Sequence, residues 1–119
     1  MKAFSILFML ASLSAGTWNW QALAPLSQPR AGYGAGVVKN QFVIAGGSYW
    51  RNGQKIQTAQ TNLFDPAQNR WRVGPPLPRA LSSAASATIN GSLFVLGGTE
   101  DQHALRSAYV FDGVRWRER

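Results

Sequence analysis

The chain contains no cysteine, one histidine and only 5 acidic residues among its 119 residues. The lack of cysteine excludes disulfide bonds and lipid attachment through a thiol, so the fold must be stabilised by packing alone. One histidine, His103, and so few carboxylates do not assemble a metal site, and a copper site of tyrosine, histidine and cysteine is excluded. No Gly-x-Ser-x-Gly motif of a hydrolase occurs. We therefore expect no metal and no other cofactor.

Acidic residues are outnumbered by 12 lysines and arginines, which gives a formal net charge of +7. This charge suits an anionic partner. The basic residues are scattered singly, however, and cluster only at Arg115, Arg117 and Arg119. A nucleic-acid site requires a basic stripe that follows the phosphates. We expect solvated surface charge and no nucleic-acid partner.

Long hydrophobic runs are also missing, apart from residues 4–13, which are too few to span a bilayer as a permanent helix. Lys2 precedes this run and small residues follow it, which is the pattern of a secretory signal peptide. We predict a signal helix within residues 1–16, cleavage between 14 and 17, and a secreted or periplasmic product with no stable membrane span. The alternative is a buried N-terminal helix, which the abrupt change of composition at Trp18 disfavours.

Several unlike sequence marks recur in one order about 50 residues apart. They are a Pro-Arg pair, a Gly-Gly pair, a Phe-Asp pair and a tryptophan. Their positions are 29–30 and 78–79, 46–47 and 97–98, 64–65 and 111–112, and finally Trp20, Trp71 and Trp116. Chance explains such an ordered recurrence poorly, so the chain is expected to hold two structural repeats.

Each repeat has the pattern of short antiparallel strands separated by turns. In the first repeat we expect strands over 32–38, 41–45, 58–64 and 70–73, and in the second over 83–89, 92–96, 107–111 and 114–117. Asn90-Gly91 favours a type I′ hairpin, because both residues tolerate positive φ. The residues after each Gly-Gly pair are expected to form variable loops. The glycine-rich run 32–36 lacks the following helix of a phosphate-binding loop, and it suits a crowded innermost strand instead.

The order of features in this chain resembles the kelch repeat. It runs strand, tight turn, apolar strand, Gly-Gly, loop, aromatic-Asp, turn, tryptophan and Pro-Leu-Pro-Arg. The resemblance covers residues 18–119 and implies an all-β fold of two four-stranded antiparallel blades of an incomplete β-propeller, preceded by the signal helix. The second repeat departs from the family pattern, because Asp112-Gly113 stands where Asp-Pro is usual. We predict an N-terminal outer strand and linker over 17–27, repeat 1 over 28–76 and repeat 2 over 77–119.

Two blades are fewer than the four to eight that close a propeller. Residues 18–23 resemble a fourth strand with no blade before it, of the kind that commonly completes the last blade of a closed ring. The strand containing Trp116 would compete with it for the same edge in an assembly of copies. We therefore expect a truncated or partial gene product, or a chain whose remaining blades are encoded elsewhere, in preference to self-assembly. We also expect an isolated chain to associate through its exposed faces.

Candidate ligand-binding residues lie in the loops after the Gly-Gly pairs and in the Pro-Arg turns, because rigid strands position variable loops. Tyr49 and Trp50 offer stacking surfaces, and the arginines offer pairing for a carboxylate. The alternative for each residue is an ordinary solvated loop position. The candidates are Arg30, Tyr49, Trp50, Arg51, Arg79, Glu100 and Asp101.

Two functions remain open for such a chain. The first is a non-catalytic module that binds a protein or carbohydrate ligand through its loop face, as most kelch proteins do. The second is a fragment of an enzyme similar to the sialic-acid mutarotases, or N-acetylneuraminate epimerases, with which the run 46–50 followed by Lys55 is compatible. Opening and reclosing a sugar ring needs an acid and a base, and only Glu100 and Asp101 are loop carboxylates. We predict no catalytic residue and favour the binding module.

Overall fold

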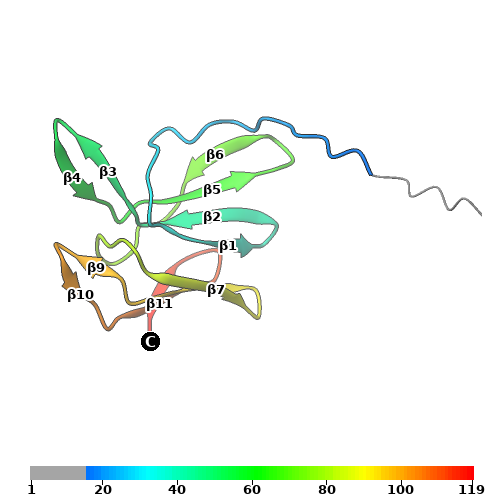
Figure 1. Cartoon of the computed structure of the whole chain (residues 1–119). Helices are drawn as coiled ribbons and strands as arrows, with labels where there is room; N and C mark the ends of the chain where they lie inside the picture. Colours follow the sequence, from blue (N-terminus) through cyan, green and yellow to red (C-terminus); the bar gives the residue numbers. More distant parts are fainter. Residues whose placement is uncertain (1–15) are drawn as a thin grey trace, which may run out of the picture.

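A computed structural model describes residues 16–119 of the chain. The predicted signal helix and the cleavage region before residue 16 lie outside the described residues. Within the described part every regular element is a strand, and no helix occurs that could cross a membrane. The all-β fold of two four-stranded antiparallel sheets is confirmed (Figure 1).

The first sheet, here called blade 1, has the order β1-β2-β5-β6. Its strands are β1 (Gly34–Val38), β2 (Gln41–Ala45), β5 (Thr61–Asp65) and β6 (Arg70–Val73). The register is continuous across the sheet, with Phe42 opposite Phe64 and Phe64 opposite Trp71. This aromatic row lies on one face of blade 1, because directly opposite residues point to the same side of a sheet.

The second sheet, blade 2, repeats this plan in the order β7-β8-β11-β12. Its strands are β7 (Ala85–Ile89), β8 (Ser92–Leu96), β11 (Ala108–Phe111) and β12 (Trp116–Glu118). Leu93 lies opposite Phe111, which lies opposite Trp116, so the aromatic row of blade 1 has its equivalent here. The predicted strand over 114–117 begins two residues later, because Val114 and Arg115 still belong to a turn around Asp112.

The turns within the blades have the chemistry expected from the sequence. Asn90 has φ 49° and Gly91 has φ 76°, which confirms the type I′ hairpin, and Lys39-Asn40 repeats it in blade 1. Asp65 accepts backbone hydrogen bonds from Ala67 and Gln68, as Asp112 does from Val114 and Arg115. The backbone hydrogen bonds from Arg115 and Val114 lower the pKa of Asp112.

The segments after the Gly-Gly pairs, which the sequence analysis predicted as variable loops, form two further β-hairpins. The first consists of β3 (Ser48–Arg51) and β4 (Gln54–Gln57), and the shorter second one of β9 (Thr99–Glu100) and β10 (His103–Ala104). Asn52 and Gly53 both have positive φ, so an Asn-Gly turn closes the first hairpin. This hairpin also explains why the third strand of blade 1 begins at Thr61 rather than at residue 58.

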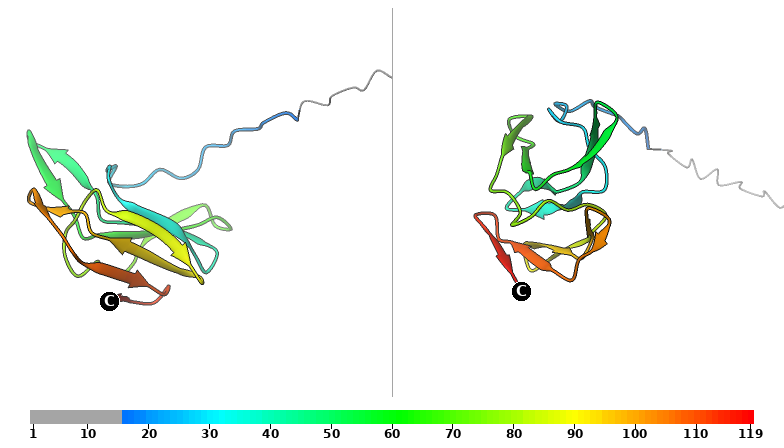
Figure 2. Two further views of the ribbon diagram at one scale, coloured as in Figure 1. Left: turned by 60° about the horizontal axis from the view of Figure 1, so that its bottom comes forward. Right: turned by 90° about the vertical axis from the view of Figure 1, so that its left-hand side faces the viewer.

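Blade 2 stacks on blade 1 face to face, as the views of Figures 1 and 2 show. Alternation along the strands places Leu93, Val95, Tyr109 and Phe111 on one face of blade 2. They pack with the blade 1 face opposite to its aromatic row and with the segment that joins the blades, to form one core. Its buried members are Val38, Val43, Ala45, Leu63, Leu77, Leu81, Leu93, Val95, Tyr109 and Phe111.

The innermost strands of the two blades lie side by side because small residues allow it. A Cβ atom added at Gly34 would approach Val95 within 2.9 Å, and one at Gly36 would collide with Thr88 and Leu93. The Ala35 backbone N–H also donates to Ser86 Oγ across this contact, at 3.1 Å. The glycine-rich run therefore serves close approach of two strands, as expected for an innermost strand.

Trp116 connects the outer edge of blade 2 to blade 1. Its indole N–H donates to Thr61 Oγ1 and to the Pro75 carbonyl, both at 3.1 Å, and its ring lies 5.0 Å from that of Phe111. Thr61 is completely buried, so this bond also satisfies its hydroxyl. The tryptophan thereby contributes both apolar area and polar satisfaction to the contact between the blades.

The N-terminal segment makes the equivalent contact on the other side of blade 1. The Trp71 indole N–H donates to the Ala24 carbonyl at 2.8 Å, and the Ala24 N–H donates to Asn69 Oδ1. Ala24 therefore corresponds to Pro75, because each provides the backbone carbonyl that accepts the indole N–H of its blade's outer-strand tryptophan. Residues 17–27, predicted as an outer strand and linker, form no strand here, and Trp18 and Trp20 are about nine-tenths exposed. Their pairing in a closed ring stays a prediction, as do the repeat boundaries at 28, 76 and 77.

We predict that Trp116→Phe lowers the free energy of unfolding by about 2 kcal/mol, because it removes ring volume and leaves Thr61 Oγ1 without its donor. The matched substitution Trp20→Phe removes the same atoms from an exposed ring and should change stability by less than about 0.5 kcal/mol. Urea denaturation of both variants measures the difference. Equal effects would show that Trp116 does not join the blades.

The outward face of blade 2 carries Leu96, which is 43% exposed, and packs against nothing in the described chain. We expect concentration-dependent association of the purified chain, because exposed apolar sheet faces and edges associate. Leu96→Arg should reduce this association, whereas Val114→Arg adds the same charge at an exposed turn and should not. Analytical ultracentrifugation measures both, and a chain that stays monomeric at every concentration would contradict the expectation.

Candidate functional site

The two extra hairpins, β3–β4 and β9–β10, project from the same end of the two blades (Figure 1). Each is held at its base by a bridge to the Pro-Arg turn before its blade. Ala31 pairs with Ser48, and Ser82 pairs with Thr99. We call the surface formed by these two hairpins the hairpin face. It brings together the loop segments and Pro-Arg turns that the sequence placed on one face.

The β3–β4 hairpin carries its side chains on two sides. Ser48 pairs with Gln57 and Trp50 with Lys55, so these four side chains share one side. Tyr49, Arg51 and Ile56 share the other, where the Arg51 guanidinium lies 5.4 Å from the centre of the Tyr49 ring. Trp50 is 71% exposed. The predicted stacking residues are thus divided, with Tyr49 beneath Arg51 and Trp50 open to solvent.

The β9–β10 hairpin carries the two predicted acidic residues. Glu100 forms an ion pair with Arg79 at 3.4 Å, and both side chains are more than a third exposed. An exposed pair of this kind contributes little to stability. Asp101 and Gln102 form the turn of the hairpin with φ 45° and 67°. This left-handed conformation is uncommon for residues other than glycine, although asparagine and aspartate adopt it more often than most.

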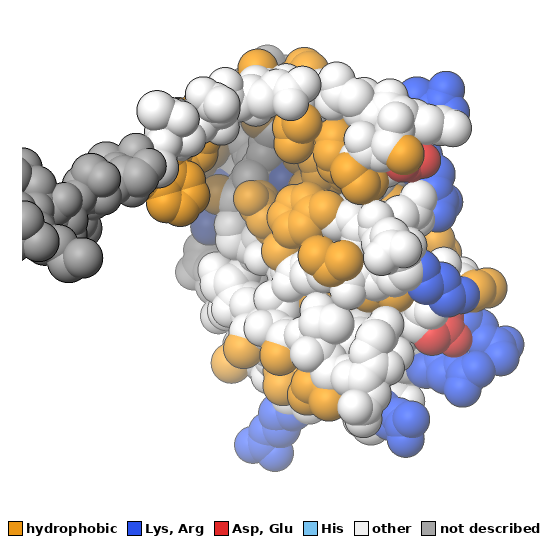
Figure 3. All heavy atoms as spheres, turned by 90° about the vertical axis from the view of Figure 1, so that its right-hand side faces the viewer, with side chains coloured by type: hydrophobic (Ala, Val, Ile, Leu, Met, Phe, Trp, Pro, Cys, Tyr) orange, Lys and Arg blue, Asp and Glu red, His pale blue; other side chains and the backbone are white. Residues whose placement is uncertain are grey.

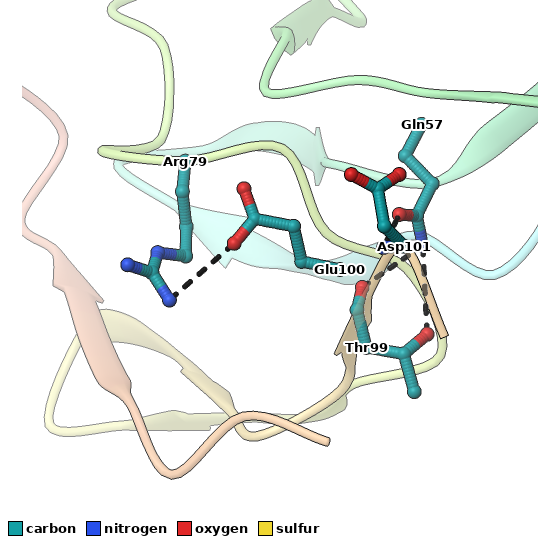
Figure 4. A network of polar contacts seen from close by, with 5 residues as sticks. All are labelled: Gln57, Arg79, Thr99, Glu100 and Asp101. Carbon is teal, nitrogen blue, oxygen red and sulfur yellow. Dashed lines mark hydrogen bonds and ion pairs between the residues drawn. The ribbon is translucent and has the colours of Figure 1, made fainter. Parts of the chain in front are cut away.

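Gln57 joins the two hairpins across the blade boundary. Its amide nitrogen donates to Ser82 Oγ at 2.7 Å and to the Thr99 carbonyl at 2.9 Å, while its oxygen accepts the Asp101 backbone N–H at 2.7 Å. Figure 4 shows Asp101 beside Gln57, with Glu100 directed away from them toward Arg79. Both ends of the Gln57 amide are therefore used to fix the β9–β10 turn.

A cavity of about 140 Å³ lies between the two hairpins. It is open to solvent, and all of its lining residues are of polar types. Its lining residues come from both blades and are Lys55, Gln57, Thr99, Asp101 and Gln102. Of these, only Asp101 belongs to the predicted ligand-binding residues. The others were missed, although the Asn52-Gly53 dipeptide between alternating residues is a hairpin signal that would have placed Lys55 opposite Trp50.

Arg30 occupies a different position from the other candidates. Its guanidinium donates to the carbonyls of Gly46 and Gln60 and to the side chains of Gln60 and Asn62. Burial lowers the pKa of Arg30, and the coulombic effect of Tyr33 opposes this. Four of the five N–H donors of the side chain are used within the protein. These contacts give Arg30 a structural role, because it holds the Gly46 and Gln60 backbone carbonyls in place. A ligand-binding role for Arg30 stays a prediction.

A second cavity of about 300 Å³ lies between the N-terminal segment and β6, lined by residues that include Ala24, Asn62 and Trp71. Figure 3 shows hydrophobic side chains gathered in the hollow under the N-terminal segment, with basic side chains toward the rim. The equivalent region in front of blade 2 is filled by blade 1. This cavity lies in front of blade 1, on the face that corresponds to the blade 2 face covered by blade 1.

Metal binding has no support on the hairpin face or elsewhere in residues 16–119. No group of three or more histidine or acidic side chains in this range is arranged to hold an ion. The hairpin face instead offers an exposed indole, several hydrogen-bonding groups and charges of both signs. Such a set suits recognition of a polar ligand.

Comparison with known proteins agrees with the repeat. A family model described as the Kelch motif matches residues 80–112. Kelch-like protein 38 of Rattus norvegicus is 31% identical over 100 residues, which cover 83% of this chain and 17% of that protein. F-box protein AFR of Arabidopsis thaliana is 31% identical over 105 residues, which cover 86% of this chain and 28% of that protein. The chain thus spans less than a third of the length of these relatives.

The fold has a solved counterpart in the structure of YjhT. That structure matches this one with a TM-score of 0.74 at 16% identity, and the match covers 84% of this chain and 41% of that chain. At this identity the likeness concerns the fold alone. Together with the Kelch motif and the two repeated sheets, it leads to one conclusion: the chain contains kelch-type repeats and has the fold of two blades of a β-propeller.

Proposed function

We propose that the chain is a non-catalytic binding module that takes a protein or carbohydrate ligand on its hairpin face. The observation that supports this most directly is the pair of hairpins held at one end of two rigid sheets, with Trp50 71% exposed between hydrogen-bonding side chains. Rigid strands that present variable loops are a common way to build a binding surface. Kelch proteins, which this chain resembles in its repeats, are mostly interaction modules.

The residue types on the hairpin face also favour binding. Tryptophan, tyrosine and arginine are enriched among the residues that dominate the energy of protein interfaces. Trp50, Tyr49 and Arg51 follow one another on β3, and the Arg51 guanidinium packs near the Tyr49 ring. The partial ordering of Arg51 reduces the entropy that it loses on binding. Arg51 and Lys55 give this hairpin a positive charge that suits an anionic ligand.

A sugar-isomerising function, the alternative drawn from the resemblance to sialic-acid mutarotases, has less support. That chemistry needs an acid and a base on one substrate. On the hairpin face, Glu100 is ion-paired with Arg79. Asp101 is then the one carboxylate there without an ion pair in residues 16–119. A single unpaired carboxylate can take part in ligand binding, but it cannot supply both the acid and the base that opening and reclosing a sugar ring requires.

We further propose that more blades complete the propeller around this pair, from a longer product or from other copies. The support is the complementarity of two open faces. Blade 2 stacks on one face of blade 1, and the outward face of blade 2 has the same strand order as that face. The aromatic row of blade 1, which faces away from blade 2, corresponds to the row through which blade 2 contacts blade 1. Further blades would add further hairpins to the binding surface.

A photo-crosslinking amino acid at Gln54, near the tip of the β3–β4 hairpin, tests the binding proposal. In cells that express the chain, we expect a discrete crosslinked product, and Trp50→Ala in the same chain should lower its yield about tenfold, as the loss of a dominant interface residue does. Mass spectrometry identifies the crosslinked molecule.

The matched control places the same crosslinker at Val114, which is 67% exposed in the turn before β12. This position lies outside the hairpin face and should give no such product. Equal products from both positions, or a product at Gln54 that does not respond to Trp50→Ala, would count against a binding role for the hairpin face.

Export is also a proposal, supported by Lys2, the short apolar run 4–13 and the small residues after it. When the chain is produced in a bacterial host, we expect a secreted or periplasmic product that begins between residues 15 and 17. Leu7→Arg should retain the uncut chain inside the cell, because a charge interrupts the apolar run. N-terminal sequencing and cell fractionation measure this, with Val114→Arg as the control. A full-length product inside the cell would overturn the proposal.

A further inference from the structure

We infer that the cavity between the two hairpins, together with Trp50, is a subsite for one saccharide unit. The inference rests on the proposed binding function and chooses the ligand class for it. The predicted ligand-binding residues do not include Lys55, Gln57 or Gln102. The structure collects these polar residues from the two hairpins around one cavity of about 140 Å³.

The lining of the cavity offers donors and acceptors that are not matched to each other. Lys55 and Asp101 both line it, yet they form no ion pair within 4.0 Å. The Gln102 amide makes no hydrogen bond to another residue of the described chain. A hydroxyl group both donates and accepts, so a row of hydroxyls can satisfy an ammonium, a carboxylate and an amide together. A phosphate or another compact anion would instead face the Asp101 carboxylate.

The walls of the cavity are fixed before any ligand arrives. Gln57 uses both ends of its amide to hold Ser82, Thr99 and the Asp101 backbone at 2.7 to 2.9 Å. Figure 4 shows the contacts of Gln57 with Thr99 and Asp101, with no contact drawn to the Asp101 carboxylate. A site that is ordered in advance loses less entropy on binding, which matters most for small polar ligands.

Trp50 supplies the apolar part of the subsite. It lies directly opposite Lys55 in the hairpin register, so its indole is on the same side as the cavity lining. Its 71% exposure leaves a ring face uncovered. A sugar ring has an apolar face of C–H groups and an edge of hydroxyls, and this combination fits an indole beside polar side chains. The cavity holds only several water molecules, so it takes one hydroxylated ring edge rather than an oligosaccharide.

The test is a titration of the full chain with glucose, galactose, mannose, N-acetylglucosamine and glucuronate, followed by two-dimensional ¹H–¹⁵N NMR. With at least one sugar, we expect saturable shifts of the Trp50 indole N–H and of the Asp101 and Gln102 amides, at concentrations up to about 10 mM. Trp50→Ala and Asp101→Asn should each weaken this binding at least about fivefold. Asparagine keeps the shape of the side chain and tolerates the positive φ of this position.

Trp20→Phe is the matched control and should leave the shifts unchanged, because that exposed ring lies on the N-terminal segment. Sodium acetate and inorganic phosphate should not reproduce them. The inference is overturned if none of the five sugars shifts these resonances, if the shifts persist in both hairpin variants, or if acetate or phosphate causes them equally. If the crosslink at Gln54 still forms in that case, the hairpin face is a binding surface and only the saccharide subsite is wrong.

Discussion

Stacking of blade 2 on blade 1 is the contact on which the rest of this structure depends. It buries Leu93, Val95 and Phe111 against blade 1 and satisfies the buried Thr61 hydroxyl through Trp116. Burial of this apolar area is the main source of stability, since the chain has no disulfide to add to it. The same contact sets the distance between the two hairpins. Gln57 can reach Ser82 and Thr99 only because the sheets beneath are already held together.

The stacking has a direction, because the two blades contact each other through unlike faces. Blade 2 presents its aromatic row to blade 1, and blade 1 presents its own row to the N-terminal segment, where Trp71 bonds Ala24 as Trp116 bonds Pro75. A contact of unlike faces can continue from blade to blade, whereas a symmetric contact would end with a pair. If further blades continue the stacking, as proposed above, the face that carries Leu96 and the hollow beside Trp71 are the two surfaces that would receive them.

Most of the sheet plan could be predicted from the sequence because its signals are local. Asn90-Gly91 specifies a hairpin by its backbone preferences, and Asp65 and Asp112 form turns with amides two and three residues away. The contacts of Arg30 and Gln57 could not be predicted in this way, because they depend on how distant segments align. Arg30 donates to residues 16 to 32 positions away, and a ligand-binding role for it stays a prediction. The β3–β4 hairpin, by contrast, could have been predicted from the sequence, because its Asn52-Gly53 turn is a local signal.

The dependence of the cavity on both blades has a thermodynamic consequence. Lys55 belongs to blade 1 and Asp101 to blade 2, so a ligand that contacts both binds only the stacked arrangement and stabilises it by mass action. Each further blade would place another hairpin beside its neighbour and form another cleft by the same rule. The clefts would differ in chemistry, because the hairpins vary while the sheets repeat: β3–β4 has four residues in each strand and β9–β10 only two. Constant faces thus preserve the stacking, and variable hairpins decide what each cleft can bind.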